Sequence, residues 1–548
     1  MHVDEQHSGD PDPAATQAAR PLRRVGSRDA HPAARRPWIA AAWIGGGLAL
    51  FAVFLRISLS SPVNSDGANN ALQAWDMLHS HLLLHGWVSG DASVYTFELP
   101  LLAITESLFG LTSITCHIAS ALTYLIVAAF SVALAVTNSR GAAAAARLGV
   151  VIAVLVGPLL TTGQGVAILL QKPDHIGTSA FLLGSFLLID RAPGWRFTPP
   201  LLLVILCAGQ LGDATVLYVA VPTVVLVCAY RALAARKIRT VDTAIALAAV
   251  VSVPLAILAR QVMVRLGAFA MVPPRTGISS PGQWEHNAVL TLHFTRTLFG
   301  ATVVGPGTES GVAAAAFGWA CLLAAAFGFA KVIWTWRTAS RAEQLVCAAI
   351  VINLAIFIVS VLPTTTDQRE IAAVLPCGAV LAARALVPAR IVGSTRARVA
   401  VLAATLAAVL PLAVAAAQPP ATSAAVTLAA WLKAHRLTYG LAGYWEASVV
   451  TLDSGNQVQV RAIVQVRAIT SKNTHFSPYY WETKPGWYDA SQHRATFVIS
   501  DNSDGVRVAA AEHSFGRPVA IYHVAGCRIM VYRTNLLAQL RPAPLPNG

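Results

Sequence analysis

Residues 38–70 read WIAAAWIGGGLALFAVFLRISLSSPVNSDGANN, an apolar run followed at once by a polar segment. The run is long enough to cross a bilayer, which takes about 20 apolar residues. Asp66 comes directly after it, and beyond it the stretch from Ala68 to His85 has apolar residues at helical spacing. That stretch is too polar to cross a bilayer, so it predicts an amphipathic helix that lies in the membrane interface or packs on other spans. An acid in this place suggests chemistry at the lipid–water boundary.

The composition of the whole chain is that of a polytopic membrane protein. Of the 548 residues, 55% are hydrophobic and only 12% are charged, whereas roughly a quarter of the residues in a soluble domain are charged. Residues 1–37 are polar and arginine-rich, which predicts a disordered, basic cytoplasmic tail. Residues 38–417 then form the predicted transmembrane domain, with about eleven spans. These are expected near 38–60, 114–137, 148–168, 176–190, 199–215, 217–234, 243–264, 311–335, 344–362, 371–388 and 398–417.

The distribution of charge over the loops predicts the orientation of the chain. If the N-terminus is cytoplasmic, every predicted inner loop is basic, as the positive-inside rule requires. The outer loops hold most of the remaining acids: Asp66, Asp91, Glu98, Glu106, Asp174, Glu285, Asp367 and Glu370. The net charge of +14 is therefore a sign of topology, and no nucleic-acid partner is expected. We predict a multi-pass protein of the bacterial plasma membrane with an external C-terminus.

Residues 418–548 differ in composition from the spans and predict an extracytoplasmic α/β domain. Gln418-Pro419-Pro420 marks the boundary, a helix is expected at 422–436, and strands are expected near 438–443, 457–466, 495–500, 518–524 and 527–533. Two clusters of aromatic and acidic residues, 444–446 and 479–482, are typical of sugar platforms and also of domain cores. We interpret them as core or as docking against the membrane domain. The seven cysteines form no CxxC or Cys/His cluster, so neither zinc nor a disulfide framework is indicated.

Asp66 is the first candidate for chemistry. A carboxylate facing water after the first span suits a general base that deprotonates an acceptor hydroxyl. Asp is also a favoured helix N-cap, so a capping role is equally compatible with the sequence. Glu98, in the same predicted outer loop (61–113), is the second acid. Together Asp66 and Glu98 offer the oxygen ligands that a divalent cation such as Mg²⁺ or Mn²⁺ prefers, but their spacing has no metal signature.

Two further outer segments carry candidate substrate-binding residues. Lys172, Asp174 and His175 share a short turn between two apolar runs, where ionisable residues often mark a site. Asp174 is also placed to cap the next helix. Arg369 precedes the tenth span, and outer-face arginines suit phosphate binding through paired hydrogen bonds. Its alternatives are a salt bridge or snorkelling to lipid headgroups.

Taken together, these features resemble the GT-C superfamily of membrane glycosyltransferases, including protein O-mannosyltransferases and aminoarabinose transferases. The resemblance rests on the acid after the first span, the amphipathic helix beyond it, polar residues in later outer loops and the external C-terminal domain. The segments 64–87, 370–376 and 439–445 also look like uncharacterised actinobacterial membrane proteins of this class. The chain departs from the usual pattern because Asp66 has no second acid beside it.

The resemblance implies an inverting transferase that uses a polyprenyl-phosphate-linked sugar as donor and a glycan, lipid or protein of the cell envelope as acceptor. Asp66 would be the base or the acceptor-positioning acid. Glu98, Lys172, Asp174, His175 and Arg369 would contact substrate or metal. Two alternatives remain open. One is a transporter or lipid flippase, although its ionisable residues would be expected near the middle of the membrane. The other is an envelope assembly protein that kept the fold and lost the activity.

Overall fold

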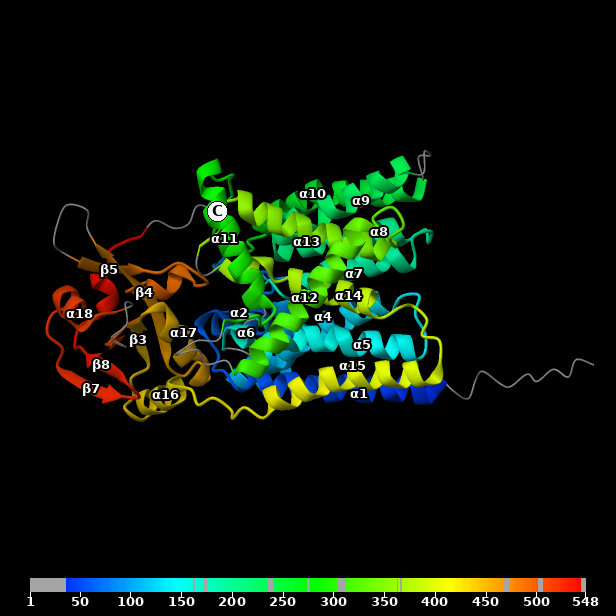
Figure 1. The fold of residues 1–548 in the computed structure, drawn as a ribbon. Helices are drawn as coiled ribbons and strands as arrows, with labels where there is room; N and C mark the ends of the chain where they lie inside the picture. The colour runs from blue at the N-terminus through cyan, green and yellow to red at the C-terminus, as the bar shows by residue number, and fades with distance from the viewer. Residues whose placement is uncertain are drawn as a thin grey trace, which may run out of the picture. The chain divides into compact units, whose positions relative to one another are not determined.

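The computed structural model describes residues 36–160, 163–171, 175–234, 240–273, 276–303, 311–361, 363–364, 367–467, 474–500 and 506–543. The chain divides into two compact units, Met1–Leu48 and Ala49–Gly548. The helix α1 (Arg36–Ser58) runs across the division. All of the elements that position the candidate site belong to the second unit, which combines a bundle of apolar helices with a C-terminal mixed β-sheet (Figure 1).

Seven helices of the described residues are long and apolar enough to cross a membrane. They are α4 (Ser113–Val136), α5 (Ala142–Val156) continued by η2 (Gly157–Leu160), η4 (Val216–Ala220) continued by α9 (Val221–Ala234), α10 (Thr240–Arg265), α12 (Val312–Trp334), α13 (Arg341–Val359) and α15 (Ser394–Ala416). Three apolar helices are shorter: the part of α1 from Trp43 to Ser58, α8 (Thr198–Gly212) and α16 (Ala424–Ala434). The chain is therefore a helical membrane protein with seven to ten apolar helices.

Each of the eleven expected spans overlaps a helix, but they are not equal in length. The fourth and tenth fall on α7 (Thr178–Arg191) and α14 (Val374–Leu386), which have 14 and 13 residues. The bounds of the third span, expected at 148–168, are wrong, because its helix begins at Ala142 and ends at Leu160. Pro158 has no N–H to continue the helical hydrogen bonds, so the chain tightens at η2 and turns into α6 (Gly163–Val166) and η3 (Ala167–Gln171).

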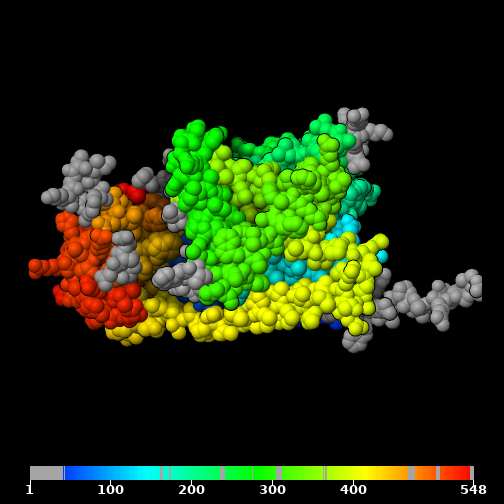
Figure 2. Space-filling view, in the orientation of Figure 1, coloured from blue at the N-terminus to red at the C-terminus, as the bar shows by residue number. Residues whose placement is uncertain are grey.

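The outer side of α15 shows why these helices belong in a bilayer. Figure 2 shows this helix, in yellow, lying along one side of the bundle. Large apolar side chains are exposed along its length: Val399, Leu402, Leu406, Val409, Leu410 and Val414. A soluble protein rarely leaves so continuous an apolar surface in water. A helix that is apolar all round matches a hydrocarbon environment.

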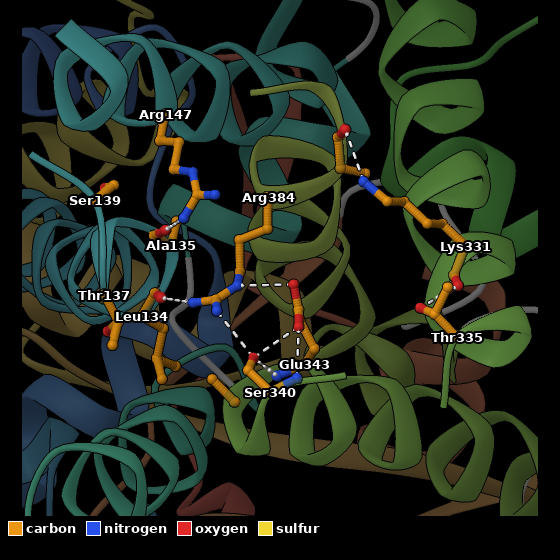
Figure 3. Close-up of polar contacts among 12 residues, drawn as sticks. Leu134, Ala135, Thr137, Ser139, Arg147, Lys331, Thr335, Ser340, Glu343 and Arg384 are labelled. Carbon is orange, nitrogen blue, oxygen red and sulfur yellow. Dashed lines mark hydrogen bonds and ion pairs between the residues drawn. The ribbon is translucent and has the colours of Figure 1, made fainter. Parts of the chain in front are cut away.

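A polar cluster ties several helices together at the end of the bundle where α4 and α14 finish and α13 begins (Figure 3). The guanidinium of Arg384 lies 3.2 Å from Glu343 Oε1 and donates to the carbonyl of Leu134 at 2.9 Å. Arg147 donates to the carbonyl of Ala135 at 2.9 Å. Glu343 also completes a capping box with Ser340 at the start of α13. These bonds satisfy helix-terminal carbonyls that would otherwise be buried without partners.

The C-terminal region folds around a six-stranded mixed sheet in the order β5-β4-β3-β6-β8-β7. Its central strand β3 (Tyr439–Ala442) runs parallel to both neighbours, β4 (Gln459–Arg467) and β6 (Phe497–Ser500), whereas β5 (Thr474–Pro478), β7 (Ala520–Val524) and β8 (Cys527–Val531) pair antiparallel. The helices of this region are α16, α17 (Tyr444–Asp453) and α18 (Val508–Phe515), with short turns η6 (Pro485–Tyr488) and η7 (Leu536–Gln539). The expected strands are all present. The additional strand β5 escaped the sequence pattern because its residues do not alternate in hydrophobicity.

The segment after α1 connects the bundle to the sheet region. It contains α2 (Ser65–His79), β1 (Val88–Ser89) and α3 (Glu98–Phe109), and β1 pairs with β2 (Ala270–Met271), which is followed by α11 (Pro281–Leu298). The expected helix at 68–85 is shifted, because it begins at Ser65 and ends at His79. Its first ten residues are buried in protein, which favours the alternative that it packs on other elements of the chain. Figure 1 shows α2 between the bundle and α17.

Candidate active site

Asp66 lies in the first turn of α2 and is 6% exposed. The N-cap of this helix is Asn64, whose side chain accepts a hydrogen bond from the Gly67 amide at 2.9 Å. The capping interpretation of Asp66 is therefore wrong, and its carboxylate is available for other contacts. The positive end of the helix dipole favours a carboxylate in this first turn.

Residues far apart in the chain meet at the Asp66 carboxylate. Tyr444 donates its hydroxyl proton to Asp66 Oδ1, and Arg369 Nη1 lies 3.6 Å from Asp66 Oδ2. Tyr444 is the first residue of α17, and Arg369 lies in the short helix η5 (Asp367–Ile371) that precedes α14. Two elements, one from the sheet region and one from the bundle, thus hold the two oxygens of one buried carboxylate.

Glu482 is a second acid in the same network. Its Oε2 lies 3.0 Å from the Tyr444 hydroxyl and 3.3 Å from Asn69 Nδ2. Asn69 follows Asp66 on the same face of α2; it donates to Tyr444 at 3.2 Å and accepts from Ser448. Burial and the neighbouring charges of Glu482 and Asp66 raise the pKa of Tyr444 well above its usual 10. Tyr444 therefore stays protonated and acts as a donor at neutral pH.

A second polar network is built around His175. Its Nδ1 lies 2.8 Å from Asp213 Oδ2, and its Nε2 lies 3.3 Å from Glu370 Oε1. Asp213 also accepts from the Thr178 hydroxyl at 2.5 Å and from the Thr215 amide at 2.8 Å. Because Glu370 is the neighbour of Arg369 in η5, the two networks are adjacent in the chain and meet at this short helix.

Part of the His175 network and Arg369 line a small cleft of about 270 Å³, counting the part open to solvent. Its polar side carries His175, Arg369 and Glu370, and its other walls are apolar, formed by Leu182, Val216, Val219 and Ala373. His175 and Glu482 also have left-handed backbones, with φ of 58° and 52°, and such strain is concentrated at functional sites.

The other predicted site residues are placed differently. Glu98 begins α3 and is buried against the His175 segment, close to Gly177. Lys172 and Asp174 lie outside the described residues. Among the residues that the structure describes, no group of three or more His, Cys, Asp or Glu side chains is arranged to hold a metal ion. The described residues therefore offer no ligand set for the divalent cation that the sequence left open.

The sequence missed Tyr444, Glu482, Asn69 and Asp213 as site residues. Tyr444 and Glu482 belong to the two aromatic and acidic clusters interpreted as core or docking. The contacts agree with docking: Lys484 Nζ lies 2.8 Å from Asp76 Oδ2, and Trp87 meets Trp487 edge to face at 5.0 Å. The polar face of α2 is the sequence feature that could have identified Asn69 as a site residue. Asp213 gave no signal beyond a polar turn between two spans.

The close packing of Gly177 against Glu98 gives a prediction. A Cβ at residue 177 would lie 1.9 Å from Glu98 Oε1 and 3.1 Å from the Phe97 ring. We expect Gly177→Ala to destabilise the protein by about 1–3 kcal/mol, as overpacking does. The midpoint of thermal unfolding in detergent measures the effect, and Glu98→Ala in the same chain should restore part of it. Gly184→Ala, whose Cβ would meet only Phe130 at 3.6 Å, is the control and should leave the midpoint unchanged or higher.

Glu106 on α3 gives a prediction about pH. Both of its carboxylate oxygens are buried without a hydrogen-bond partner, and burial raises its pKa from 4.5 to about 9. Between these values the folded chain keeps a proton that the unfolded chain releases, so stability falls as pH rises through this window. Glutamine carries no such proton. We therefore expect Glu106→Gln to unfold at a higher temperature than the parent, by a margin that grows from pH 5 to pH 9. An equal margin at both pH values would contradict the burial of a neutral acid, and Glu512→Gln, at an exposed residue, is the control.

Comparison with solved structures identifies the fold. The structure matches ArnT from Cupriavidus metallidurans in the apo state with a TM-score of 0.55 and 13% sequence identity, covering 92% of this chain and 100% of that one. It matches the same protein bound to undecaprenyl phosphate with a TM-score of 0.53 and 13% identity, covering 92% and 99%. No protein-family model and no curated protein matches the sequence. The expected resemblance to the aminoarabinose transferase type of GT-C protein is confirmed at the level of the fold. These matches do not support the resemblance to actinobacterial proteins.

Proposed function

We propose that the protein is an inverting glycosyltransferase that moves a sugar from a polyprenyl phosphate to a cell-envelope acceptor. The observation that carries the proposal is the pair formed by the buried Asp66 and the partly exposed Arg369, 3.6 Å apart, in a chain with the fold of ArnT. One structure of ArnT holds undecaprenyl phosphate. A carboxylate beside a guanidinium supplies the two groups that this reaction needs, a proton acceptor and a phosphate-binding cation.

Asp66 acts as the base or as the acid that positions the acceptor. The acceptor hydroxyl gives its proton to the Asp66 carboxylate as its oxygen forms a bond to the anomeric carbon of the donor sugar. The bond between that carbon and the phosphate oxygen breaks, and the polyprenyl phosphate leaves with the electron pair. Attack from the side opposite the phosphate inverts the anomeric centre. General-base assistance of this kind typically contributes 10²–10⁴-fold.

Arg369 binds the donor phosphate. Its side chain is 32% exposed, so part of the guanidinium faces solvent while Nη1 faces Asp66. Paired hydrogen bonds from a guanidinium fit phosphate oxygens and stabilise the charge that develops on the leaving group. The aliphatic walls formed by Leu182, Val216 and Val219 continue from this side of the cleft. In the donor complex these side chains would contact the first isoprene units of the lipid.

The proposed orientation places this site on the outer face of the bacterial plasma membrane. Asp66 and Arg369 lie at the same end of the bundle as the C-terminal sheet region. The cluster of Arg147, Arg384 and Glu343 lies where α4 ends and α13 begins, in and beside the predicted inner loops (Figure 3). Basic residues favour the cytoplasmic side. We accordingly divide the chain into a cytoplasmic tail (1–37), a transmembrane domain (38–417) and an extracytoplasmic domain (418–548).

A transfer assay tests the proposal. The full-length protein in lipid nanodiscs is incubated with polyprenyl phosphates that carry different labelled sugars and with extracted envelope acceptors. The expected result is labelled acceptor and free polyprenyl phosphate in equal amounts. Movement of intact donor across vesicle membranes, with the sugar–phosphate bond unbroken, would support a flippase instead. Normal envelope glycan in cells that carry a stable Asp66→Asn protein would support the non-catalytic assembly protein.

A further inference from the structure

The position of Glu482 supplies what the sequence around Asp66 lacks, a second acid. We propose that Glu482, carried by the C-terminal domain, is a positioning residue that sets the basicity of Asp66 through the hydroxyl of Tyr444. This inference rests on the proposed function and goes beyond it, because it assigns part of the site to a domain that is separate from the spans. The three residues form a continuous line of oxygens, from Asp66 Oδ1 through the Tyr444 hydroxyl to Glu482 Oε2.

The Tyr444 hydroxyl has one proton and two carboxylate neighbours. A tyrosine hydroxyl has one proton and donates one strong hydrogen bond. Here two carboxylates accept from it, Asp66 and Glu482, the second at 3.0 Å. When the proton points to Glu482, Asp66 Oδ1 loses its donor and becomes the stronger base. When the proton points to Asp66, that carboxylate is stabilised and becomes the weaker base. Glu482 therefore competes with Asp66 for a single donor.

The residues around Glu482 keep its carboxylate beside the Tyr444 hydroxyl. Its carboxylate is buried, and Asn69 Nδ2 donates to it at 3.3 Å while also donating to the Tyr444 oxygen at 3.2 Å. Gly90 lies against the other carboxylate oxygen, where a Cβ would be 3.3 Å away. Little room is left for Glu482 to turn away from the hydroxyl. Among the contacts that the structure describes, the Arg369 guanidinium and the phenol of Tyr479 also face Asp66.

The pH dependence of transfer tests the inference. Glu482→Gln removes a negative charge and a competing acceptor, so the Tyr444 proton stays on Asp66 and the acidic limb of the kcat profile moves to lower pH. Tyr444→Phe removes the donor from Asp66, so the same limb moves to higher pH. We expect kcat to fall about tenfold in Glu482→Gln, in line with a lost hydrogen bond to a charged group, with the donor KM unchanged. In the Tyr444→Phe background the shift caused by Glu482→Gln should shrink.

Opposite shifts separate this role from a merely structural one, which would lower the amount of active protein without moving the profile. Shifts in the same direction, or a change in KM alone, would overturn the inference. Glu512→Gln makes the same charge change at an exposed residue of the same domain and is the control.

A second measurement does not depend on transfer. The midpoints of thermal unfolding are compared for Asp66→Asn, Glu482→Gln and the double variant, in chains with Tyr444 and with Tyr444→Phe. Non-additive effects with Tyr444 that become additive with Phe are expected. Additive effects in both backgrounds would overturn the inference. If Asp66→Asn transfers sugar normally, the proposed function fails; if Asp66→Asn is inactive and the two profiles do not diverge, only the role of Glu482 fails.

Discussion

Asp66→Asn is expected to lower the kcat of sugar transfer by about 10²–10⁴-fold, the usual contribution of a general base. Asparagine keeps the shape of the side chain and an oxygen that accepts from Tyr444, but it takes no proton from the acceptor hydroxyl. Helix α2 keeps its cap, because Asn64 is the capping residue. The thermal midpoint should therefore change little while transfer is lost. Transfer rates and unfolding midpoints of the purified proteins, measured side by side, check this result.

Asp91→Asn is the matched control for that experiment. Asp91 lies in the same segment between α2 and α3 and bonds only locally, through Oδ1 to the Ala92 amide, among the contacts that the structure describes. It makes the same change of charge on the same side of the bundle. Its transfer rate should equal that of the parent. If both variants lose activity equally, the loss reports the charge of the whole segment, and Asp66 has no special role.

Arg369→Gln is expected to lower kcat/KM for the lipid donor by about 10²–10³-fold, comparable to removing one group that stabilises developing charge in an active site. Arg369→Lys should recover only part of this loss, because an ammonium does not form the paired hydrogen bonds of a guanidinium. Steady-state kinetics with varied donor concentration separate the effects on KM and kcat. Arg265→Gln, at an exposed arginine at the end of α10, is the control. Full recovery in Arg369→Lys would contradict paired binding of phosphate.

The apolar helices were predictable from the sequence because they depend on a local pattern. Apolar runs of sufficient length identify transmembrane helices without any tertiary information. The boundary at α5 was not predictable to the residue, because Pro158 acts together with the tight packing of its neighbours. Two short helices, α7 and α14, complete the bundle although each is shorter than an ordinary span.

The partners of Asp66 were not predictable, because they arrive from distant parts of the chain. Tyr444 is separated from Asp66 by 378 positions, and no periodic pattern connects them. The choice between Asn64 and Asp66 as the cap of α2 was equally hidden, since both residue types cap helices well. The sequence predicted that the polar face of α2 is exposed to water. In the structure α17 covers this face. Each of these features depends on tertiary packing.

The docking of the last third of the chain on α2 has a consequence for how the protein matures. Lys484 meets Asp76, the backbone of Thr483 pairs with Val88, and Tyr444 and Glu482 reach Asp66 only from residues that the ribosome makes late. A nascent chain whose spans have already inserted carries Asp66 and Arg369 without the partners that complete the network. In the proposed orientation, the finished arrangement forms only after the C-terminal region has crossed the membrane and folded against the segment after α1. A chain that ends before Tyr444 would therefore insert its spans but lack the partners that complete the network around Asp66.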